Sequence, residues 1–246
     1  MRKTLNIAHR GANTVAPENT LVAFREALAI GVDGFELDIQ LSGDNVPVVI
    51  HDEKLERTTN GKGLVKDHSL AALKELDAGA WFAPRYEGER IPTLEEVFAE
   101  FAHTDLLFNL ELKSGIVLYP GLEEAVIKLV EKYNLLEQTI ISSFNHYSLV
   151  ECRKLNPEMR TGILYYAGLY EPWNYAKALG CYSVHPLFYH LQHPELVKGF
   201  KENNLPLFTW TVNEPLYMEM LVAGGIEGII TDEPAELKTI IEGINN

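Results

Sequence analysis

The stretch FELDIQLSGDNVPVVIHD, residues 35–52, decides how the chain folds. Its first half alternates apolar and acidic side chains with a period of two, which predicts a strand with Glu36 and Asp38 on one face. Turn-forming residues follow at 42–45, and a second apolar run leads to His51. The stretch therefore predicts a β-hairpin that carries two carboxylates and an imidazole.

The predicted register brings these polar groups together. If the turn is centred between Gly43 and Asp44, Glu36 lies opposite His51 and both side chains leave the same side of the sheet. Neighbouring carboxylates repel one another unless a cation or a shared proton lies between them, so the pattern favours a metal site or an acid–base role. The alternative is the solvated face of an edge strand, because antiparallel sheets often expose one face to water.

Outside the hairpin, strands and helices alternate along the chain. A buried strand at 5–8 precedes a helix at 19–30, and the glycine-rich residues 53–92 contain one short helical piece at 69–76. Without the second arm of the hairpin the strands number eight, which predicts a (β/α)8 TIM barrel. Further helices are expected at 93–102, 121–133, 146–155, 172–179, 194–203, 215–223 and 234–242, and further strands at 106–112, 138–142, 160–165, 181–184, 206–211 and 226–231.

We expect one barrel domain over residues 1–246, with residues 53–92 as a small insertion after the hairpin strand that ends at His51. The rival fold is an open doubly wound sheet, but no GxGxxG motif follows the first strand. Polar residues instead follow many different strands. Because the chemistry of a TIM barrel lies at the carboxyl ends of its strands, these residues should meet there.

Composition narrows the possible partners and the compartment. The chain has 246 residues, 46% of them hydrophobic, and a net charge of −14, which argues against nucleic acid or an anionic membrane surface as the main partner. We found no apolar run long enough for stable membrane insertion. Cys152 and Cys181 have no metal-site or redox spacing, which fits buried thiols in a reducing cytoplasm. The oligomeric state is not encoded in any recognisable pattern.

Three acids at strand ends predict a metal site. The period-two pattern of residues 107–113 places Asn109, Glu111 and Lys113 on one face, so Glu111 should join Glu36 and Asp38. Three carboxylates without cysteine favour a divalent cation that prefers oxygen ligands, Mg²⁺ or Ca²⁺, over Zn²⁺.

Other strand-end residues complete the candidate site. Arg10 and Lys113 supply the positive charge that an acidic protein needs for an anionic ligand. His9 and His51 are candidate proton carriers because imidazole titrates near neutral pH. Trp210 either stacks on a bound ligand or packs inside the barrel. Each residue also has a structural interpretation, but their occurrence together indicates phosphoryl chemistry on a small-molecule substrate.

The same residues belong to an ordered series of motifs that resembles the glycerophosphodiester phosphodiesterase family, a group of phospholipase-C-like TIM barrels, over nearly the whole chain. The resemblance implies divalent-cation-dependent cleavage of glycerophosphodiesters to an alcohol and glycerol phosphate. It implies Glu36, Asp38 and Glu111 as metal ligands and His9 and His51 as general acid and base. It also implies that Arg10 and Lys113 lie near the phosphate. The motifs are HRG at 9–11, PENT at 17–20, ELD at 36–38, HD at 51–52, RTT at 57–59, LDAG at 76–79, IPTL at 91–94, ELK at 111–113, WTVN at 210–213 and TD at 231–232.

Several assignments keep an alternative. The chain is either a glycerophosphodiester phosphodiesterase, a phospholipase-D-like or phosphoinositide-cleaving relative acting on lipids, or a non-catalytic phosphoglycerol-binding protein. Asn19 is most simply a helix N-cap, and Glu18 is a candidate to orient Arg10. His185, before a proline at a predicted strand end, is expected to line the rim, and we assign no metal to the loop histidines.

Overall fold

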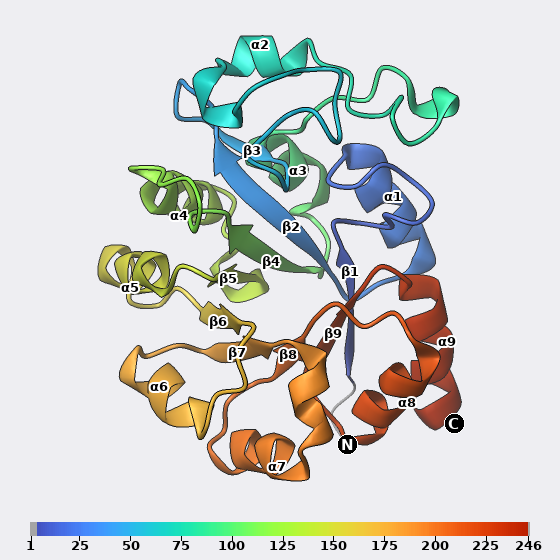
Figure 1. Cartoon of the computed structure of the whole chain (residues 1–246), viewed down its shortest axis with the longest axis vertical. Coiled ribbons are helices and arrows are strands. Elements are labelled where there is room, and N and C mark those ends of the chain that lie inside the picture. The colour runs from blue at the N-terminus through green and yellow to red at the C-terminus, as the bar shows by residue number, and fades with distance from the viewer. Residues whose placement is uncertain (1–3, 246) are drawn as a thin grey trace.

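The computed structural model of the chain describes residues 4–245, so residues 1–3 and 246 of the predicted domain lie outside the described part. Nine strands form one sheet in the order β7-β6-β5-β4-β2-β1-β9-β8, with β3 added beside β2. The sheet curls into a barrel surrounded by helices (Figure 1). The strands are β1 Leu5–His9, β2 Gly34–Leu41, β3 Pro47–Val49, β4 Leu107–Leu112, β5 Thr139–Ser143, β6 Thr161–Tyr165, β7 Ser183–Pro186, β8 Phe208–Thr209 and β9 Gly228–Thr231.

The barrel closes between β7 and the segment around β8. Parallel bridges join Val184 to Leu207 and Leu187 to Trp210, and the Val184 amide donates to the Pro206 carbonyl at 3.0 Å. Every ladder except β2–β3 is parallel, so the predicted (β/α)8 barrel is confirmed. The helices are α1 Leu21–Ile30, α2 Leu70–Lys74, α3 Leu94–Phe101, α4 Leu122–Lys132, α5 His146–Leu155, α6 Pro172–Ala178, α7 Pro194–Glu202, α8 Pro215–Ala223 and α9 Pro234–Asn245.

The alternation in β2 divides its side chains between two environments. Phe35 and Leu37 are fully buried in the core between the sheet and the helices. The Phe35 ring packs against Phe24 of α1 and Phe101 of α3, with centroids 5.1 and 5.3 Å away. Burying a phenylalanine side chain contributes roughly 1.5–3 kcal/mol, so this packing fixes the orientation of the strand. The acids that alternate with these residues therefore face the barrel interior.

The hairpin forms, but its predicted register is wrong by one residue. Ile39 pairs with Val49, so the turn is centred on Asp44 and Glu36 does not lie opposite His51. The paired strand β3 also ends at Val49, before His51. The reason is the length of the loop, because the Ser42 amide donates to the Val46 carbonyl and leaves three residues between them. Asn45 takes the left-handed conformation, φ +62°, that such three-residue loops require.

Residues 51–92 lie between β3 and α3 and cover one edge of the barrel, at the top of Figure 1. They contain α2 and two single-turn 3-10 helices at 65–67 and 84–86. Their apolar side chains form a second buried cluster with the outer part of the hairpin, which holds this segment against the barrel. The cluster is Val48, Ile50, Leu55, Val65, Leu73, Ala78 and Ile91. In residues 4–245, no helix has both the length and the apolar composition needed to cross a bilayer.

Candidate active site

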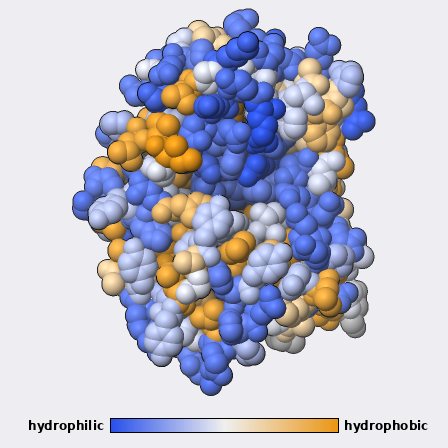
Figure 2. All heavy atoms as spheres, in the orientation of Figure 1, coloured by the Kyte–Doolittle hydropathy of each residue, from blue (hydrophilic) through white to orange (hydrophobic). Residues whose placement is uncertain are grey.

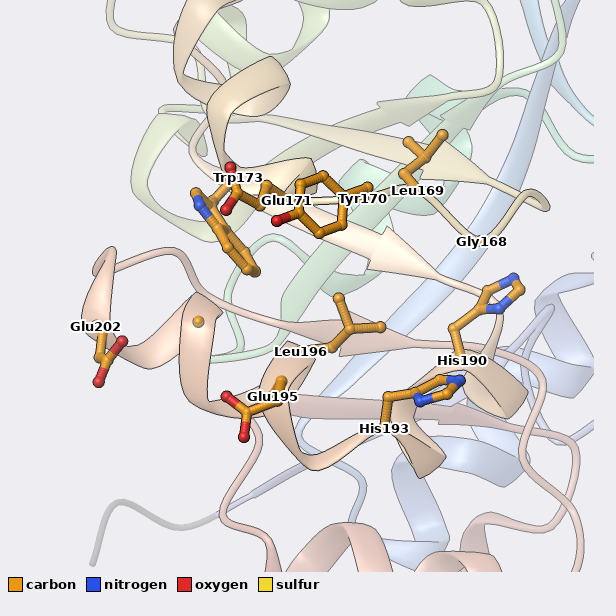
Figure 3. A pocket seen from close by; sticks show the side chains of 11 residues that line it. Gly168, Leu169, Tyr170, Glu171, Trp173, His190, His193, Glu195, Leu196 and Glu202 are labelled. Carbon is orange, nitrogen blue, oxygen red and sulfur yellow. The ribbon is translucent and has the colours of Figure 1, made fainter.

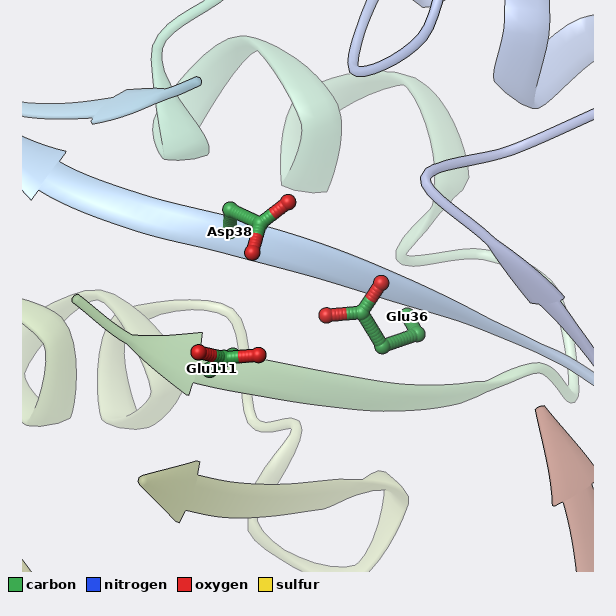
Figure 4. Close-up of side chains that lie close together, drawn as sticks. All are labelled: Glu36, Asp38 and Glu111. Atoms are coloured by element: carbon green, nitrogen blue, oxygen red, sulfur yellow. The ribbon is translucent and has the colours of Figure 1, made fainter. Parts of the chain in front are cut away.

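Three carboxylates from two neighbouring strands point toward one another inside the barrel (Figure 4). Glu36 and Asp38 come from β2, and Glu111 comes from β4. The parallel register pairs Asp38 with Glu111, so the alternation of both strands delivers all three acids to the same face. One oxygen of each acid lies within 4.8 Å of one oxygen of each of the others. The structure thus brings together the three predicted metal ligands.

Burial and charge act differently on the three acids. Burial raises the pKa of Glu36 well above its usual value, and the charges of Asp38 and Glu111 raise it further. Burial also raises the pKa of Glu111, although Lys113 opposes this shift. For Asp38 burial acts in the same direction, but Arg10 and Lys113 outweigh it and hold the pKa below its usual range. Burial and like charge therefore oppose the ionisation of Glu36 and Glu111, whereas the two cations favour that of Asp38.

The two predicted cations border the acids. The Arg10 guanidinium donates from Nη1 to Glu18 at 2.9 Å, and its Nε lies 3.3 Å from Asp38. Lys113 Nζ donates to Glu111 at 2.9 Å and lies 3.7 Å from Asp38. Two cations thus face three carboxylates, which leaves negative charge available for a bound metal ion.

The acid cluster fits a divalent cation that prefers oxygen ligands. Glu36 Oε1 and Asp38 Oδ1 are both buried and have no hydrogen-bond partner among the described residues. A buried carboxylate oxygen without a partner is costly, and a cation would remove that cost. The donors are all carboxylate oxygens, the ligands typical of Mg²⁺ and Ca²⁺.

A tight turn after β1 places Arg10. Its backbone has φ +57°, an uncommon value for a residue with a side chain, and its amide donates to the Glu36 carbonyl oxygen at 2.9 Å. Gly11 follows at φ +80°, where an added Cβ would come within 2.7 Å of the Ala23 backbone. The HRG motif therefore supplies the side chains of His9 and Arg10, and its glycine allows the backbone to turn where a larger residue would not fit.

His9, the last residue of β1, reaches the acids from one side of the site. Its Nε2 lies 3.9 Å from Glu36 Oε2, and its Nδ1 lies 2.6 Å from an oxygen of Asp232. Asp232 follows β9 and accepts hydrogen bonds from the side-chain amides of Asn13 and Asn213. Burial opposes the ionisation of Asp232, but these hydrogen bonds, that of His9 foremost, lower its pKa. A carboxylate at Nδ1 leaves Nε2 as the nitrogen that faces the acids.

His51 has a similar partner, although it reaches the site through the bend after β3. Its Nδ1 lies 2.5 Å from Asp52. Gln40 of β2 holds the bend by donating to the carbonyl oxygens of Ile50 and His51 at 3.1 and 2.9 Å. Asp52 also accepts two hydrogen bonds from Arg57, which lower its pKa to about 2. A positive charge on His51 would lower the pKa of both Asp38 and Glu111, which places the imidazole near these two acids.

Trp210 lines the inner part of the site. A cavity of about 20 Å³, enough for about one water, is bounded by Trp210 together with His9, Glu36 and Glu111. Its indole donates to the His185 carbonyl oxygen at 2.8 Å, which fixes the orientation of the ring. Phe144 and Tyr166 stack on each other beside it, with centroids 4.7 Å apart.

The structure resolves the alternatives for the residues around Arg10. The N-cap of α1 is Thr20, whose hydroxyl accepts from the Ala23 amide, so the expectation for Asn19 is wrong. Asn19 has φ +57° and donates from Nδ2 to Asp38 at 2.8 Å. Asp38 is buried and needs a hydrogen-bond donor, so the Asn19 side chain binds Asp38 instead of capping the helix. Glu18 does accept a hydrogen bond from Arg10, which agrees with the orienting role.

His185 does not line the rim. It lies within β7 rather than at its end, and its side chain is fully buried. It shares a hydrogen bond with Ser183 at 2.8 Å and stacks on Phe208. An added Cβ at Gly162 would come within 2.3 Å of its ring, so the neighbouring strand leaves room for it. Burial lowers the pKa of His185 to about 3, and it is therefore a neutral core histidine.

A larger pocket lies away from the acids. It measures about 590 Å³, lies between the segment after β6 and α7, and contains none of the predicted site residues (Figure 3). The loop histidines His190 and His193 line it together with Trp173 and Glu171. Figure 2 shows hydrophilic residues gathered below the segment that carries α2.

The geometry agrees with comparisons to known proteins. The model of the "Glycerophosphoryl diester phosphodiesterase family" matches residues 9–236. The chain belongs to this family. A glycerophosphodiester phosphodiesterase from Caldanaerobacter subterraneus is 52% identical over 97% of this chain and 98% of its own length. These findings confirm the predicted family.

Solved structures of other phosphodiesterases share the fold. An Oleispira antarctica phosphodiesterase in complex with the product sn-glycerol-3-phosphate is 32% identical, has a TM-score of 0.88 and covers 98% of this chain and 97% of its own. A glycerophosphodiester phosphodiesterase from Agrobacterium tumefaciens is 27% identical, has a TM-score of 0.85 and covers 96% and 99%. The sequence of this glycerophosphoryl diester phosphodiesterase family member predicted the acids, cations and histidines and, among their partners, only Glu18 beside Arg10. Asp232, Asn213 and Arg57 lay within recognised motifs, and only their positions in space reveal what they contact.

Proposed function

We propose that the chain hydrolyses glycerophosphodiesters to an alcohol and sn-glycerol 3-phosphate, using a divalent cation and two histidines. The observation that carries this proposal is the cluster of Glu36, Asp38 and Glu111, two of whose buried oxygens accept no hydrogen bond from the described residues. Two cations border this cluster, and two histidine–aspartate pairs approach it. The family match supports the substrate class, as does the product bound to the Oleispira relative.

The charged residues are suited to a phosphodiester. Arg10 and Lys113 neutralise phosphate oxygens and so stabilise the negative charge that grows in the transition state. Glu36, Asp38 and Glu111 would hold Mg²⁺ or Ca²⁺, which when bound supplies Lewis-acid stabilisation of phosphate oxygens. Trp210, whose orientation is fixed by its hydrogen bond to the barrel wall, offers a flat surface to the substrate.

The two histidines divide the proton transfers. One removes a proton from the nucleophile, and the other protonates the oxygen of the leaving alcohol. Asp232 and Asp52 hold the Nδ1 atoms, so each imidazole can exchange a proton through Nε2. The nucleophile is either water or a hydroxyl of the glycerol group, and in the second case a cyclic phosphate forms first.

The wider assignments follow from the same observations. The names of the relatives favour glycerophosphodiesters over the lipid-cleaving and non-catalytic alternatives. We also propose that residues 53–92 are an insertion within a single barrel domain, supported by their separate buried cluster. A cytoplasmic location is supported by two free cysteines, Cys152 and Cys181, both buried.

The direct test uses ³¹P NMR to follow glycerophosphocholine and glycerophosphoethanolamine with the purified protein. We expect sn-glycerol 3-phosphate to form, EDTA to abolish the reaction, and Mg²⁺ or Ca²⁺ to restore it. A lysolipid run in parallel distinguishes the lipid-cleaving alternative. Turnover that is unaffected by EDTA would contradict the metal-dependent mechanism, and absence of turnover with every cation would contradict the proposed activity.

A further inference from the structure

Arg57 lies in the segment after β3, residues 51–92, and its guanidinium binds two carboxylates beside the candidate site. Its Nε and Nη2 donate to Asp52 at 2.7 and 2.9 Å. Its Nη1 and Nη2 donate to Glu18 at 2.8 Å each. One guanidinium thus binds two carboxylates, each through both of its oxygens, which is the geometry that arginine supports and lysine does not.

Both carboxylates lead to residues of the proposed mechanism. Asp52 holds Nδ1 of His51, and Glu18 accepts from Arg10, whose guanidinium in turn borders Asp38. Charges therefore alternate in sign from Asp52 through Arg57 and Glu18 to Arg10. Removing the central cation would leave Asp52 and Glu18 facing each other as like charges, which favours a rearrangement of both.

The local fold keeps Arg57 in place. It lies in a single turn in which the Thr59 amide and hydroxyl both bind the Leu55 carbonyl oxygen, at 3.1 and 2.6 Å. Leu55 is fully buried in the second apolar cluster, and Thr58 beside Arg57 is 5% exposed. The cluster therefore anchors the turn, and through Arg57 it anchors one histidine and one phosphate-binding cation.

We propose that Arg57 is a positioning residue that couples the segment after β3 to His51 through Asp52 and to Arg10 through Glu18. This inference rests on the proposed function for its kinetic consequences but not for its structural ones. The segment then contributes to catalysis, because Arg57 sets the orientation of the His51 imidazole and of the Arg10 guanidinium.

A spectroscopic experiment tests the structural coupling without any substrate. We expect separate low-field proton resonances for the Nδ1–H groups of His9 and His51, assigned by their loss in His9→Ala and His51→Ala. In Arg57→Ala the His51 resonance should shift or broaden, whereas that of His9 should remain. Arg85→Ala is the matched control, since Arg85 lies in the same segment but binds the Val15 carbonyl oxygen. An unchanged His51 resonance in Arg57→Ala overturns the proposal.

Kinetics test the consequence for catalysis. Arg57→Ala should lower kcat by about 10- to 100-fold, the usual cost of removing a residue that orients an active-site ligand, and should raise KM. Arg57→Lys should recover only part of the loss in kcat, because lysine cannot bind both carboxylates in this way. In a His51→Ala background the effect of Arg57→Ala on kcat should become smaller, because one of the two groups through which Arg57 acts is already absent and only the path through Glu18 and Arg10 remains. A merely structural role predicts the same loss in both backgrounds, and that result would also overturn the proposal. A wild-type enzyme without turnover, but with the coupled His51 resonance, would instead refute the proposed function alone.

Discussion

The two histidine–aspartate pairs approach the same acids from different parts of the chain and are held by different chemistry. Asp232 of the His9 pair follows β9 and is fixed by the neutral amides of Asn13 and Asn213. Asp52 of the His51 pair follows the hairpin and is fixed by the charged guanidinium of Arg57, which also binds Glu18. One pair is supported by the closing strands of the barrel, and the other by a segment outside it.

The kind of group that binds each aspartate decides whether a change at one histidine affects the rest of the site. Neutral amides from two loops restrain Asp232 without cancelling its charge, so His9 keeps a full carboxylate partner. Arg57 both restrains and neutralises Asp52, and it connects this pair to Arg10. We therefore expect changes near His51 to spread to substrate binding, and changes near His9 to remain local.

The largest expected effect concerns the histidines themselves. His9→Ala and His51→Ala should each lower kcat by about 10²- to 10⁴-fold, the typical contribution of general acid–base catalysis, with the fold retained. Steady-state kinetics and a thermal melt measure the two quantities. His103→Ala, at an exposed position beyond α3, is the control. Full activity in either single variant would remove that pair from the mechanism.

Replacing the partner of His9 should have the next largest effect. Asp232→Asn places an amide against the donors Asn13 and Asn213 and no longer selects the Nδ1–H tautomer of His9. We expect kcat to fall by about 10- to 100-fold with little change in KM, in contrast to Arg57→Ala. Initial rates over a range of substrate concentrations separate the two parameters. An equal rise in KM for both variants would show that the pairs do not differ as described.

The acids shared by both pairs give a prediction about stability. Because burial raises the pKa of Glu36, its ionisation opposes folding, and Glu36→Gln should raise the free energy of unfolding of the protein in EDTA at pH 8. The folded state binds this proton more tightly than the unfolded state, so the advantage of the variant should shrink as the pH falls toward the ordinary value of glutamate. Urea denaturation at pH 8 and pH 5 measures both. Added Ca²⁺ should stabilise the wild type more than the variant, and a variant less stable than the wild type in EDTA at pH 8 would contradict this account.

The smallest expected effect concerns the neutral amides. Asn213 donates to Asp232 and accepts from its backbone amide at 3.0 Å. Asn213→Ala should lower kcat only about threefold to tenfold, because an ordinary hydrogen bond contributes about 0.5–1.5 kcal/mol and Asn13 remains. Asn174→Ala, at an exposed position on α6, is the matched control. A loss as large as that of Asp232→Asn would show that one amide alone positions the carboxylate.

Sequence patterns predicted the site best where they act along a single strand. Alternation in β2 and β4 was enough to place Glu36, Asp38 and Glu111 on one face, because neighbouring parallel strands repeat the same period. The hairpin register failed because it depends on the length of one loop, and a loop of three residues shifts every pair by one. The role of Asn19 failed because a buried carboxylate nineteen residues away competes for its amide.

The sequence alone determined the alternation of strands and helices, the family and the set of acids, cations and histidines, since each depends on local periodicity or on short motifs. Only the tertiary structure decided which partners hold those groups. Asp232 lies 223 residues from His9 along the chain, and Arg57 lies 39 residues from Glu18. Contacts across such separations are set by the closure of the barrel and by the packing of the segment after β3, and no local pattern records them.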